Sequence, residues 1–330
     1  MRKGTCSFWL AAMALLVLAS TVGTVATWAD VLVVDHNNND IVNLYNDDGT
    51  PVNAGNPTLI SLLFATGVAV GPDGAVYVDT GDPQTVPSSS ELASVFKYTY
   101  DSTTGVVTSS SPFVQYDGTP ASVFNPQGMK FGANGDLYVA DEGGNGVVHL
   151  FDPSGNSVTT LLPAGTPTAV AFGPNGNLYA ATGIGIEEYD STTQSFNTVV
   201  VAETGGPNNP GDLAFGPDGK LYVLDISSAD PQIFQYNADG SDQQLFGSLP
   251  ADFQPSNMAF GPDGSLYVSG GDLDTGQGEV LKANATGTQY SVFISGLSNP
   301  GFLAFTDVPE PATLGLLAGG LVLFVRRRSR

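Results

Sequence analysis

Cysteine, positive charge and charged residues in general are scarce in this 330-residue chain. The only cysteine is Cys6, so a disulfide or a thiolate metal site in the rest of the chain is excluded. Charged residues make up 13%, and residues 30–307 carry four lysines, no arginine and 31 acidic residues, a formal charge of −27. Nucleic acid and anionic lipid surfaces are therefore poor partners. The acidic excess fits either a solubility requirement or the binding of divalent cations.

The chain also lacks long apolar runs. A membrane-spanning helix needs about 20 apolar residues, and both apolar runs of this chain are shorter. The first run, residues 8–18, follows Arg2 and Lys3 and precedes small residues that end at Ala29. This is the pattern of a secretory signal peptide. We predict that residues 1–29 are a signal peptide cleaved after Ala29, and not a transmembrane anchor.

The second apolar run, residues 312–325, is followed by arginines at the extreme C-terminus. A helix of this length spans only about 21 Å, so it reaches across a bilayer only with local thinning and arginine snorkelling. The arginines should stay cytoplasmic, which places the preceding domain outside the inner membrane. We expect transient inner-membrane anchoring by this helix.

The C-terminal 23 residues resemble the PEP-CTERM sorting signal of Gram-negative bacteria, which combines a short motif, a glycine-containing apolar helix and an arginine cluster. The residues that carry the resemblance are Val308, Pro309, Glu310, Pro311, Arg326, Arg327 and Arg328. The resemblance implies that residues 308–330 are recognised and removed by an exosortase. It further implies a destination at the cell surface or in the extracellular matrix, in association with exopolysaccharide. The alternative is a plain C-terminal membrane anchor.

Glycine and proline are abundant, with 41 and 22 residues, a composition typical of many short strands and turns. Five segments share the pattern of an apolar strand, a Gly-Pro-Asp-Gly-like turn and a Leu-Tyr-Val strand, and their first turn glycines are Gly71, Gly132, Gly173, Gly216 and Gly261. Each predicts a β-hairpin, because proline and Asp or Asn suit the central turn positions and glycine the left-handed one. The tyrosine of the Leu-Tyr-Val strand should pack between neighbouring units.

The spacing of the repeats, with steps of 61, 41, 43 and 45 residues, is typical of the blades of a β-propeller. The long step indicates an insertion at about residues 80–120. Residues 31–35 match the second strand of the hairpin and residues 301–305 match the first, so they should pair and form a sixth blade. We predict an all-β fold over residues 30–307, a six-bladed propeller with one blade closed by its N- and C-terminal strands.

Residues 35–45 and 141–151, which follow the second strand of two units, resemble the NHL repeat and the wider group of gluconolactonase and streptogramin-lyase propellers. NHL repeats place a basic residue where Asp40 and Gly146 stand here, which weakens any transfer of NHL partners to this chain. The gluconolactonase resemblance implies a divalent ion in the central channel held partly by a Glu near the start of the domain. This chain has no Glu before Glu91.

Residues suited to acid–base or nucleophilic catalysis are few. The domain has two histidines, His36 in an inter-strand turn and His149 on a third strand, and it has no Gly-x-Ser-x-Gly motif. The alternation of His149 with apolar neighbours predicts a half-exposed strand position for it. The sequence therefore favours a non-enzymatic protein, with a secreted metal-dependent hydrolase or lyase as the alternative.

Calcium is the metal that the oxygen-rich turns fit best, because hard cations take six to eight oxygen ligands. The candidate ligands are Asp35, Asn37, Asn39, Asp40, Asp141, Asp225, Asp272 and Asp274. The alternative is that these are solvated turns in which Asp and Asn bond their own backbone. Together, these features predict an exported propeller that acts as a binding or scaffold module, with exopolysaccharide or an envelope protein as its partner.

Overall fold

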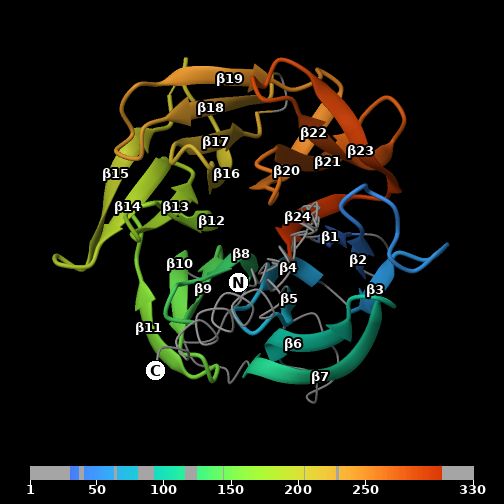
Figure 1. Ribbon diagram of the computed structural model, residues 1–330. Helices are drawn as coiled ribbons and strands as arrows, with labels where there is room; N and C mark the ends of the chain where they lie inside the picture. Colours follow the sequence, from blue (N-terminus) through green and yellow to red (C-terminus); the bar gives the residue numbers. More distant parts are fainter. Residues whose placement is uncertain are drawn as a thin grey trace, which may run out of the picture.

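The structure, a computed structural model, describes residues 30–36, 41–62, 65–80, 93–115, 125–143, 145–203, 205–227 and 230–306. Within these ranges, 24 strands form six four-stranded antiparallel sheets, and no segment is helical. The sheets stand around a central axis as blades (Figure 1). This confirms the prediction of an all-β, six-bladed propeller.

The first three complete blades follow one another along the chain, each running outward from the axis. Blade 1 contains β4 (Ala65–Val70), β5 (Val76–Thr80), β6 (Ala93–Asp101) and β7 (Val106–Gln115). Blade 2 contains β8 (Pro126–Phe131), β9 (Leu137–Asp141), β10 (Val147–Phe151) and β11 (Ser157–Leu161). Blade 3 contains β12 (Pro167–Phe172), β13 (Leu178–Thr182), β14 (Gly185–Asp190) and β15 (Ser195–Val201).

The remaining blades complete the ring. Blade 4 contains β16 (Pro210–Phe215), β17 (Leu221–Asp225), β18 (Gln232–Tyr236) and β19 (Gln244–Ser248). Blade 5 contains β20 (Phe253–Phe260), β21 (Leu266–Asp272), β22 (Gln277–Ala283) and β23 (Tyr290–Leu297). Blade 6 contains β24 (Pro300–Phe305), β1 (Val31–Asp35), β2 (Ile41–Tyr45) and β3 (Thr58–Ser61).

Blade 6 joins the two ends of the propeller. Strand β24 pairs with β1 in a register that sets Phe305 opposite Val31 and Leu303 opposite Val33. The hydroxyl of Thr306 also accepts a hydrogen bond from the backbone N–H of Asp30 at 2.9 Å. The pairing closes the ring within residues 30–306 and removes the free sheet edges that an open array would expose.

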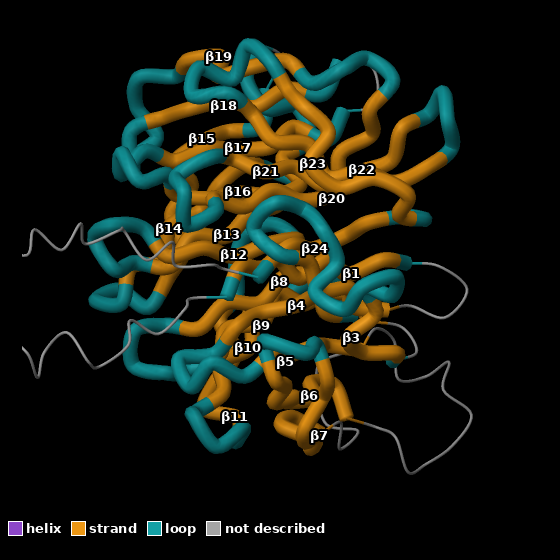
Figure 2. Tube along the Cα trace, turned by 45° about the vertical axis from the view of Figure 1, so that its right-hand side comes forward, coloured by secondary structure: helices purple, strands orange, loops and turns teal. Residues whose placement is uncertain are grey.

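The region where the repeat spacing is longest includes the outer part of blade 1. Strands β6 and β7 are this blade's third and fourth strands, so part of residues 80–120 belongs to the regular blade. Residues 81–92 and 116–124, which complete that region, lie outside the described residues. In Figure 2 the strands form the body of the ring and the loops lie at its periphery.

The turn between the first and second strands has the geometry that its residues favour. In blade 1 the N–H of Gly74 donates to the carbonyl of Gly71 at 2.9 Å, and Gly74 has a φ of +74°. The carboxylate of Asp73 accepts a hydrogen bond from the N–H of Ala75 at 3.1 Å. The left-handed φ explains the glycine at this position.

The repeated tyrosine packs between blades, as the sequence predicts. Tyr77 of blade 1 meets Phe131 of blade 2 edge to face, with ring centroids 4.7 Å apart. The corresponding pairs are Tyr138–Phe172, Tyr179–Phe215, Tyr222–Phe260 and Tyr267–Phe305, at 4.9 to 5.1 Å. Between blades 6 and 1 the same positions hold Leu32 and Val70, which belong to one hydrophobic cluster. Each aromatic pair adds about 1 kcal/mol beyond burial, so these contacts fix the stacking of the blades.

Candidate binding cavity

The six first strands, β4, β8, β12, β16, β20 and β24, lie nearest the axis, and each contacts the first strands of both neighbouring blades (Figure 1). Because they repeat the same sequence pattern, equivalent residues form rings around the axis. The ring two residues before the turn is made of Ala69, Lys130, Ala171, Ala214, Ala259 and Ala304, and we call it the alanine ring. The ring four residues before the turn is made of Gly67, Gly128, Ala169, Asp212, Asn257 and Phe302, and we call it the inner ring.

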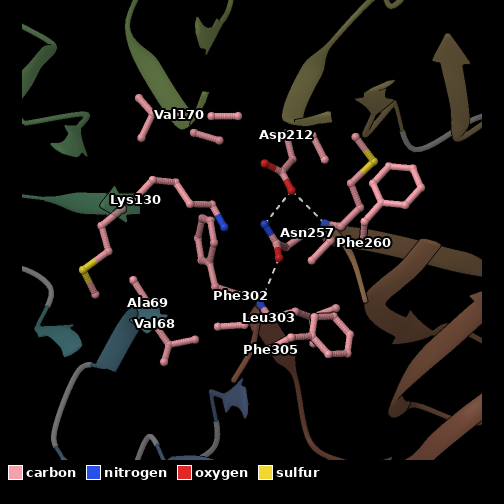
Figure 3. Close-up of a pocket in the computed structure, with 18 of the residues that line it drawn as sticks. Val68, Ala69, Lys130, Val170, Asp212, Asn257, Phe260, Phe302, Leu303 and Phe305 are labelled. Atoms are coloured by element: carbon pink, nitrogen blue, oxygen red, sulfur yellow. Dashed lines mark hydrogen bonds between the residues drawn. The ribbon is translucent and has the colours of Figure 1, made fainter. Parts of the chain in front are cut away.

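A cavity of about 460 Å³ lies on the axis between these strands. The described residues that line it begin at the inner ring, with Gly128, Asp212 and Phe302 among them, and extend to the hairpin turn at Gly261 and Pro262. The cavity therefore occupies the end of the channel where the first and second strands are joined. Figure 3 shows Lys130, Asp212, Asn257 and Phe302 around its centre.

Asp212 and Asn257 form a hydrogen-bonded pair that links three blades. The carboxylate of Asp212 accepts from the side-chain amide of Asn257 at 2.5 Å, from the N–H of Met258 at 2.7 Å and from its neighbour Leu213 at 2.8 Å. The side-chain oxygen of Asn257 accepts from the N–H of Leu303 at 2.9 Å (Figure 3). Both residues are 4% exposed. The pair thus satisfies backbone donors of β16, β20 and β24.

Burial sets the protonation of Asp212. Loss of water raises the pKa of this carboxyl to about 7, although the hydrogen bonds from Met258, Leu213 and Asn257 and the positive charge of Lys130 act in the opposite direction. At neutral pH both protonation states of Asp212 are therefore populated. A carboxyl with this pKa can accept or donate a proton.

Lys130 is the cation of the cavity. Its side chain points inward from β8, where the other five blades have alanine in the alanine ring (Figure 3). The surface that it exposes faces the cavity, so the ammonium is surrounded by protein yet accessible to a ligand. Burial lowers its pKa, an effect that the charge of Asp212 opposes. Within the described residues its Nζ has no hydrogen-bond or ion-pair partner.

Phe302 closes the inner end of the cavity on one side. Its ring reaches from β24 to β8, where a Cβ built on Gly128 would lie 3.1 Å from its Cε1 atom. That contact favours glycine at position 128, since a Cβ there would press on the ring and on the backbone of Ala169. The cavity therefore offers aromatic and aliphatic surface, with Phe302 at its inner end, together with one ammonium and one carboxyl among the described lining residues.

A second buried carboxyl lies outside the cavity lining, on β5. Asp79 is fully buried, and its Oδ1 accepts hydrogen bonds from the hydroxyl of Thr66 and from the N–H of Gly67, the latter at 2.6 Å. In the described part of the chain its Oδ2 has no hydrogen-bond partner. Burial raises the pKa of Asp79 to about 7, and the charge of Asp141 acts in the same direction. Asp79 is thus largely protonated below neutral pH.

Three of the predicted calcium ligands hold loops instead of facing the cavity. Asp35, Asp141 and Asp225 each end the second strand of a blade, in blades 6, 2 and 4, and we call them the loop-clamp aspartates. Each accepts backbone N–H groups of the loop that precedes the first strand of its own blade. These donors are Asn299 at 2.7 Å, Asn125 at 2.7 Å and Asn208 at 2.8 Å.

Blade 3 makes the equivalent contact with another residue. Glu187 of β14, 1% exposed, accepts from the N–H groups of Ala164 and Gly165 at 3.0 and 3.1 Å. These residues precede β12, the first strand of that blade. The loop clamp is therefore a recurrent structural feature of the ring.

The other predicted calcium ligands are Asn37, Asn39, Asp40, Asp272 and Asp274. Asn37, Asn39 and Asp40 fall outside the described residues. Asp272 accepts the N–H groups of Asp274 and Thr275 at 2.9 and 2.8 Å, so its carboxylate caps its own turn. Among the residues that the structure describes, no three His, Cys, Asp or Glu side chains are grouped so that they could hold a metal ion. Calcium binding stays a prediction.

The expectation that His149 is half-exposed is wrong, since it is 1% exposed. It lies between β9 and β11 in the blade, its Nε2 is 3.0 Å from the carboxylate of Asp141, and its ring stacks on Phe151 at a centroid distance of 5.9 Å. His36 directly follows β1, and its Nε2 lies 2.6 Å from the position that a Cβ on Gly301 would take. Neither histidine lines the cavity.

The sorting residues Val308, Pro309, Glu310 and Pro311, the apolar segment 312–325 and the arginine cluster lie outside the described residues, as does the signal peptide. Within the described ranges, no helix has the length and apolar character needed to cross a membrane.

Two protein-family models match parts of the chain. Residues 35–182 match the SMP-30/gluconolactonase/LRE-like region, and residues 307–329 match the PEP-CTERM protein-sorting motif. No curated protein matches the chain in sequence. The fold is a six-bladed propeller, and the first match shows that residues 35–182 are similar to gluconolactonase-like proteins. The second match indicates export to the cell envelope or surface.

Solved structures show the same fold at low identity. A candidate 6-phosphogluconolactonase from Bacteroides uniformis superposes with a TM-score of 0.57 at 16% identity, over 85% of this chain and all of the other. A protein of unknown function from Bacteroides caccae gives 0.57 at 12%, over 84% and 98%. An inactive variant of virginiamycin B lyase from Staphylococcus aureus with quinupristin gives 0.51 at 14%, over 84% and 82%. These likenesses establish the fold alone.

The candidate residues predicted from the sequence do not include Lys130, Asp212, Asn257 or Phe302. The repeat alignment nevertheless contains the signal, because each replaces the alanine or glycine that other blades carry at the same position. The hydrogen bonds between blades could not be foreseen, since they depend on how far β16 and β20 lie apart.

Proposed function

We propose that this protein is a binding or scaffold module of the cell surface or extracellular matrix of a Gram-negative bacterium, delivered there by an exosortase. The observation that carries the proposal is the combination of a PEP-CTERM motif at residues 307–329 with a closed propeller whose repeat is broken inside an axial cavity. Scaffold positions of the repeat hold the ring together. The positions that differ from the repeat line the cavity, where a partner can reach them.

The charge of the domain restricts that partner. A formal charge of −27 on residues 30–307 opposes nucleic acid and anionic membranes. An exopolysaccharide or an envelope protein, reached after transient attachment of the C-terminal helix to the inner membrane, fits the address. The propeller then acts outside the cell without the tail.

The test is fractionation of cells that express the full chain, beside a variant with Pro309→Ala, Glu310→Ala and Pro311→Ala. We expect the unaltered protein in the surface or matrix fraction at a mass reduced by the tail, and the variant in the inner membrane. The purified mature domain should then sediment with exopolysaccharide, or retain an envelope protein, from the same strain. A mature domain that stays free in the medium and does neither would contradict the proposal.

The second candidate is a secreted hydrolase or lyase of the gluconolactonase-like group. The match at residues 35–182 and the raised pKa of Asp212 opposite the lowered pKa of Lys130 favour it, since such pairs are frequent in active sites. A screen of lactones and esters, with Asp212→Asn as the control, separates the two. Turnover that Asp212→Asn abolishes would establish the enzyme.

Calcium is tested separately by thermal unfolding of residues 30–306 with chelator and then with millimolar calcium. A ligand that binds only the folded state raises the midpoint. We expect calcium to raise it by several degrees and magnesium at equal ionic strength to leave it unchanged. Equal curves with both ions would rule out calcium sites in the turns.

A further inference from the structure

The axial cavity places its single ammonium where the fold does not need it. Of the four lysines in residues 30–307, Lys97 pairs with Asp73 at 2.5 Å, Lys282 pairs with Asp263 at 2.6 Å, and Lys220 lies in the turn between β16 and β17. Lys130 points into the cavity and has no protein partner among the described residues (Figure 3). The side chain of Lys130 is exposed and belongs to the cavity lining, so a ligand that enters the cavity can reach its ammonium. A bound anion would supply a partner.

The neighbouring carboxyl does not already neutralise Lys130. Both oxygens of Asp212 are occupied by N–H donors from Leu213, Met258 and Asn257. Its contact with Lys130 is a longer-range charge interaction and not an ion pair within 4 Å. The ammonium therefore keeps its three hydrogen-bond donors for a ligand.

We propose that the axial cavity binds a small organic monocarboxylate, whose carboxylate meets Lys130 and whose uncharged part packs on Phe302 and the alanine ring. The inference rests on the proposed binding function and assigns its ligand class. One ammonium beside one ionisable carboxyl balances at most one negative charge, which excludes a dianion such as a phosphate monoester. The volume of about 460 Å³ suits a ligand of monosaccharide to disaccharide size.

The binding should depend on pH through Asp212. Lys130 and Asp212 are the ionisable residues among the described cavity lining. The strands packed against β16 add Tyr179, Tyr222 and Asp225, of which Asp225 is held by the loop before β16. Above about pH 7 Asp212 becomes an anion and repels the ligand. Affinity is therefore higher at pH 6 than at pH 8.

The test is isothermal titration calorimetry on residues 30–306, which the β1–β24 pairing closes into a complete ring. The probes are D-glucuronate, the neutral D-glucose and the dianionic glucose 6-phosphate. We expect D-glucuronate to bind and the other two to bind at least about tenfold more weakly, because a hydrogen bond between charged groups is lost or a second charge is unpaired. Binding of D-glucose as tight as that of D-glucuronate, or no binding of D-glucuronate at millimolar concentration, overturns the proposal.

The decisive variant is Lys130→Ala, which gives blade 2 the alanine that the other five blades have at this position. It should keep the circular dichroism spectrum and lose at least about tenfold in affinity. Lys220→Ala, which removes the same charge outside the cavity lining, should bind as the unaltered domain does. Unchanged affinity in Lys130→Ala overturns the site. If the proposed delivery to the cell surface or matrix is wrong, the fractionation of the full chain will show it. Lys130→Ala should not change the fraction in which the full chain is found.

Discussion

The polar residues at the two ends of the propeller axis are distributed differently over the blades. At the end where loops enter the first strands, aspartates recur from blade to blade, and Asp35, Asp141 and Asp225 hold the loops of their own blades. At the hairpin end, the alanine ring is interrupted once, by Lys130, and the inner ring by Asp212, Asn257 and Phe302. Recurrent polar residues therefore maintain the scaffold, and singular ones form the cavity. Changes at the first should unfold the domain, and changes at the second should alter what it binds.

Loss of a loop clamp should have the largest effect on stability. Asp225→Ala leaves the N–H groups of Asn208 and Asn209 and the Ser227 hydroxyl, whose hydrogen bonds are partly buried, without their acceptor. We expect a loss of about 3 kcal/mol in the free energy of unfolding in urea. Asp239→Ala, at an exposed turn of the same blade, is the matched control and should cost less than about 1 kcal/mol. Equal losses would remove the distinction between clamp and turn.

The largest contributions to the pH dependence of stability should come from the buried carboxyls Asp79 and Asp212, whose pKa values are raised furthest. Their folded pKa values of about 7 exceed the unfolded value near 4, so the folded state holds protons that the unfolded chain releases. Their contribution is complete below about pH 4 and is lost as the pH rises to about 7. We expect the free energy of unfolding to fall by a few kcal/mol between pH 5 and pH 8.

The variant that isolates this effect is Asp79→Asn, because an amide resembles the protonated acid. Its stability should change less between pH 5 and pH 8 than that of the unaltered domain, whereas Asp239→Asn should leave the slope unchanged. A domain that becomes more stable toward pH 8 would contradict the assignment.

The smallest effect on stability should follow from Lys130→Ala. Alanine fits this position in five of the six blades, and the substitution removes an exposed cation that has no hydrogen-bond or ion-pair partner among the described residues. We expect the free energy of unfolding to stay within about 1 kcal/mol of the original or to rise. A loss of more than about 2 kcal/mol would mean that Lys130 holds the ring together, as the loop-clamp aspartates do.

The six-bladed ring could be predicted from the sequence because residues close together in the chain determine the structure of each blade. The Gly-Pro-Asp-Gly turn and the Leu-Tyr-Val strand determine the hairpin from neighbouring residues, and the match between residues 31–35 and 301–305 predicted the closing pair. The packing role of the repeated tyrosine also followed, since its recurrence required the same environment in each blade.

The candidate site was less accessible to the same reasoning. Lys130 departs from the alanine ring visibly, but its direction depends on the twist of β8 at the axis. The burial of His149 was missed because period-two alternation does not show that both faces of a blade are covered by neighbouring blades. The sequence could not show that Asp35, Asp141 and Asp225 hold loops, because the N–H donors lie in the loop before a different strand of the same blade.

The most direct measurement of the central claim is lysine footprinting of residues 30–306 by mass spectrometry, with and without saturating D-glucuronate. Four lysines make the readout complete, and Lys130 is the one that lines the cavity. We expect the ligand to slow reductive methylation of Lys130 and to leave Lys97, Lys220 and Lys282 unchanged. Modification of Lys130 at the same rate in both samples would contradict a binding site formed where the repeat is broken.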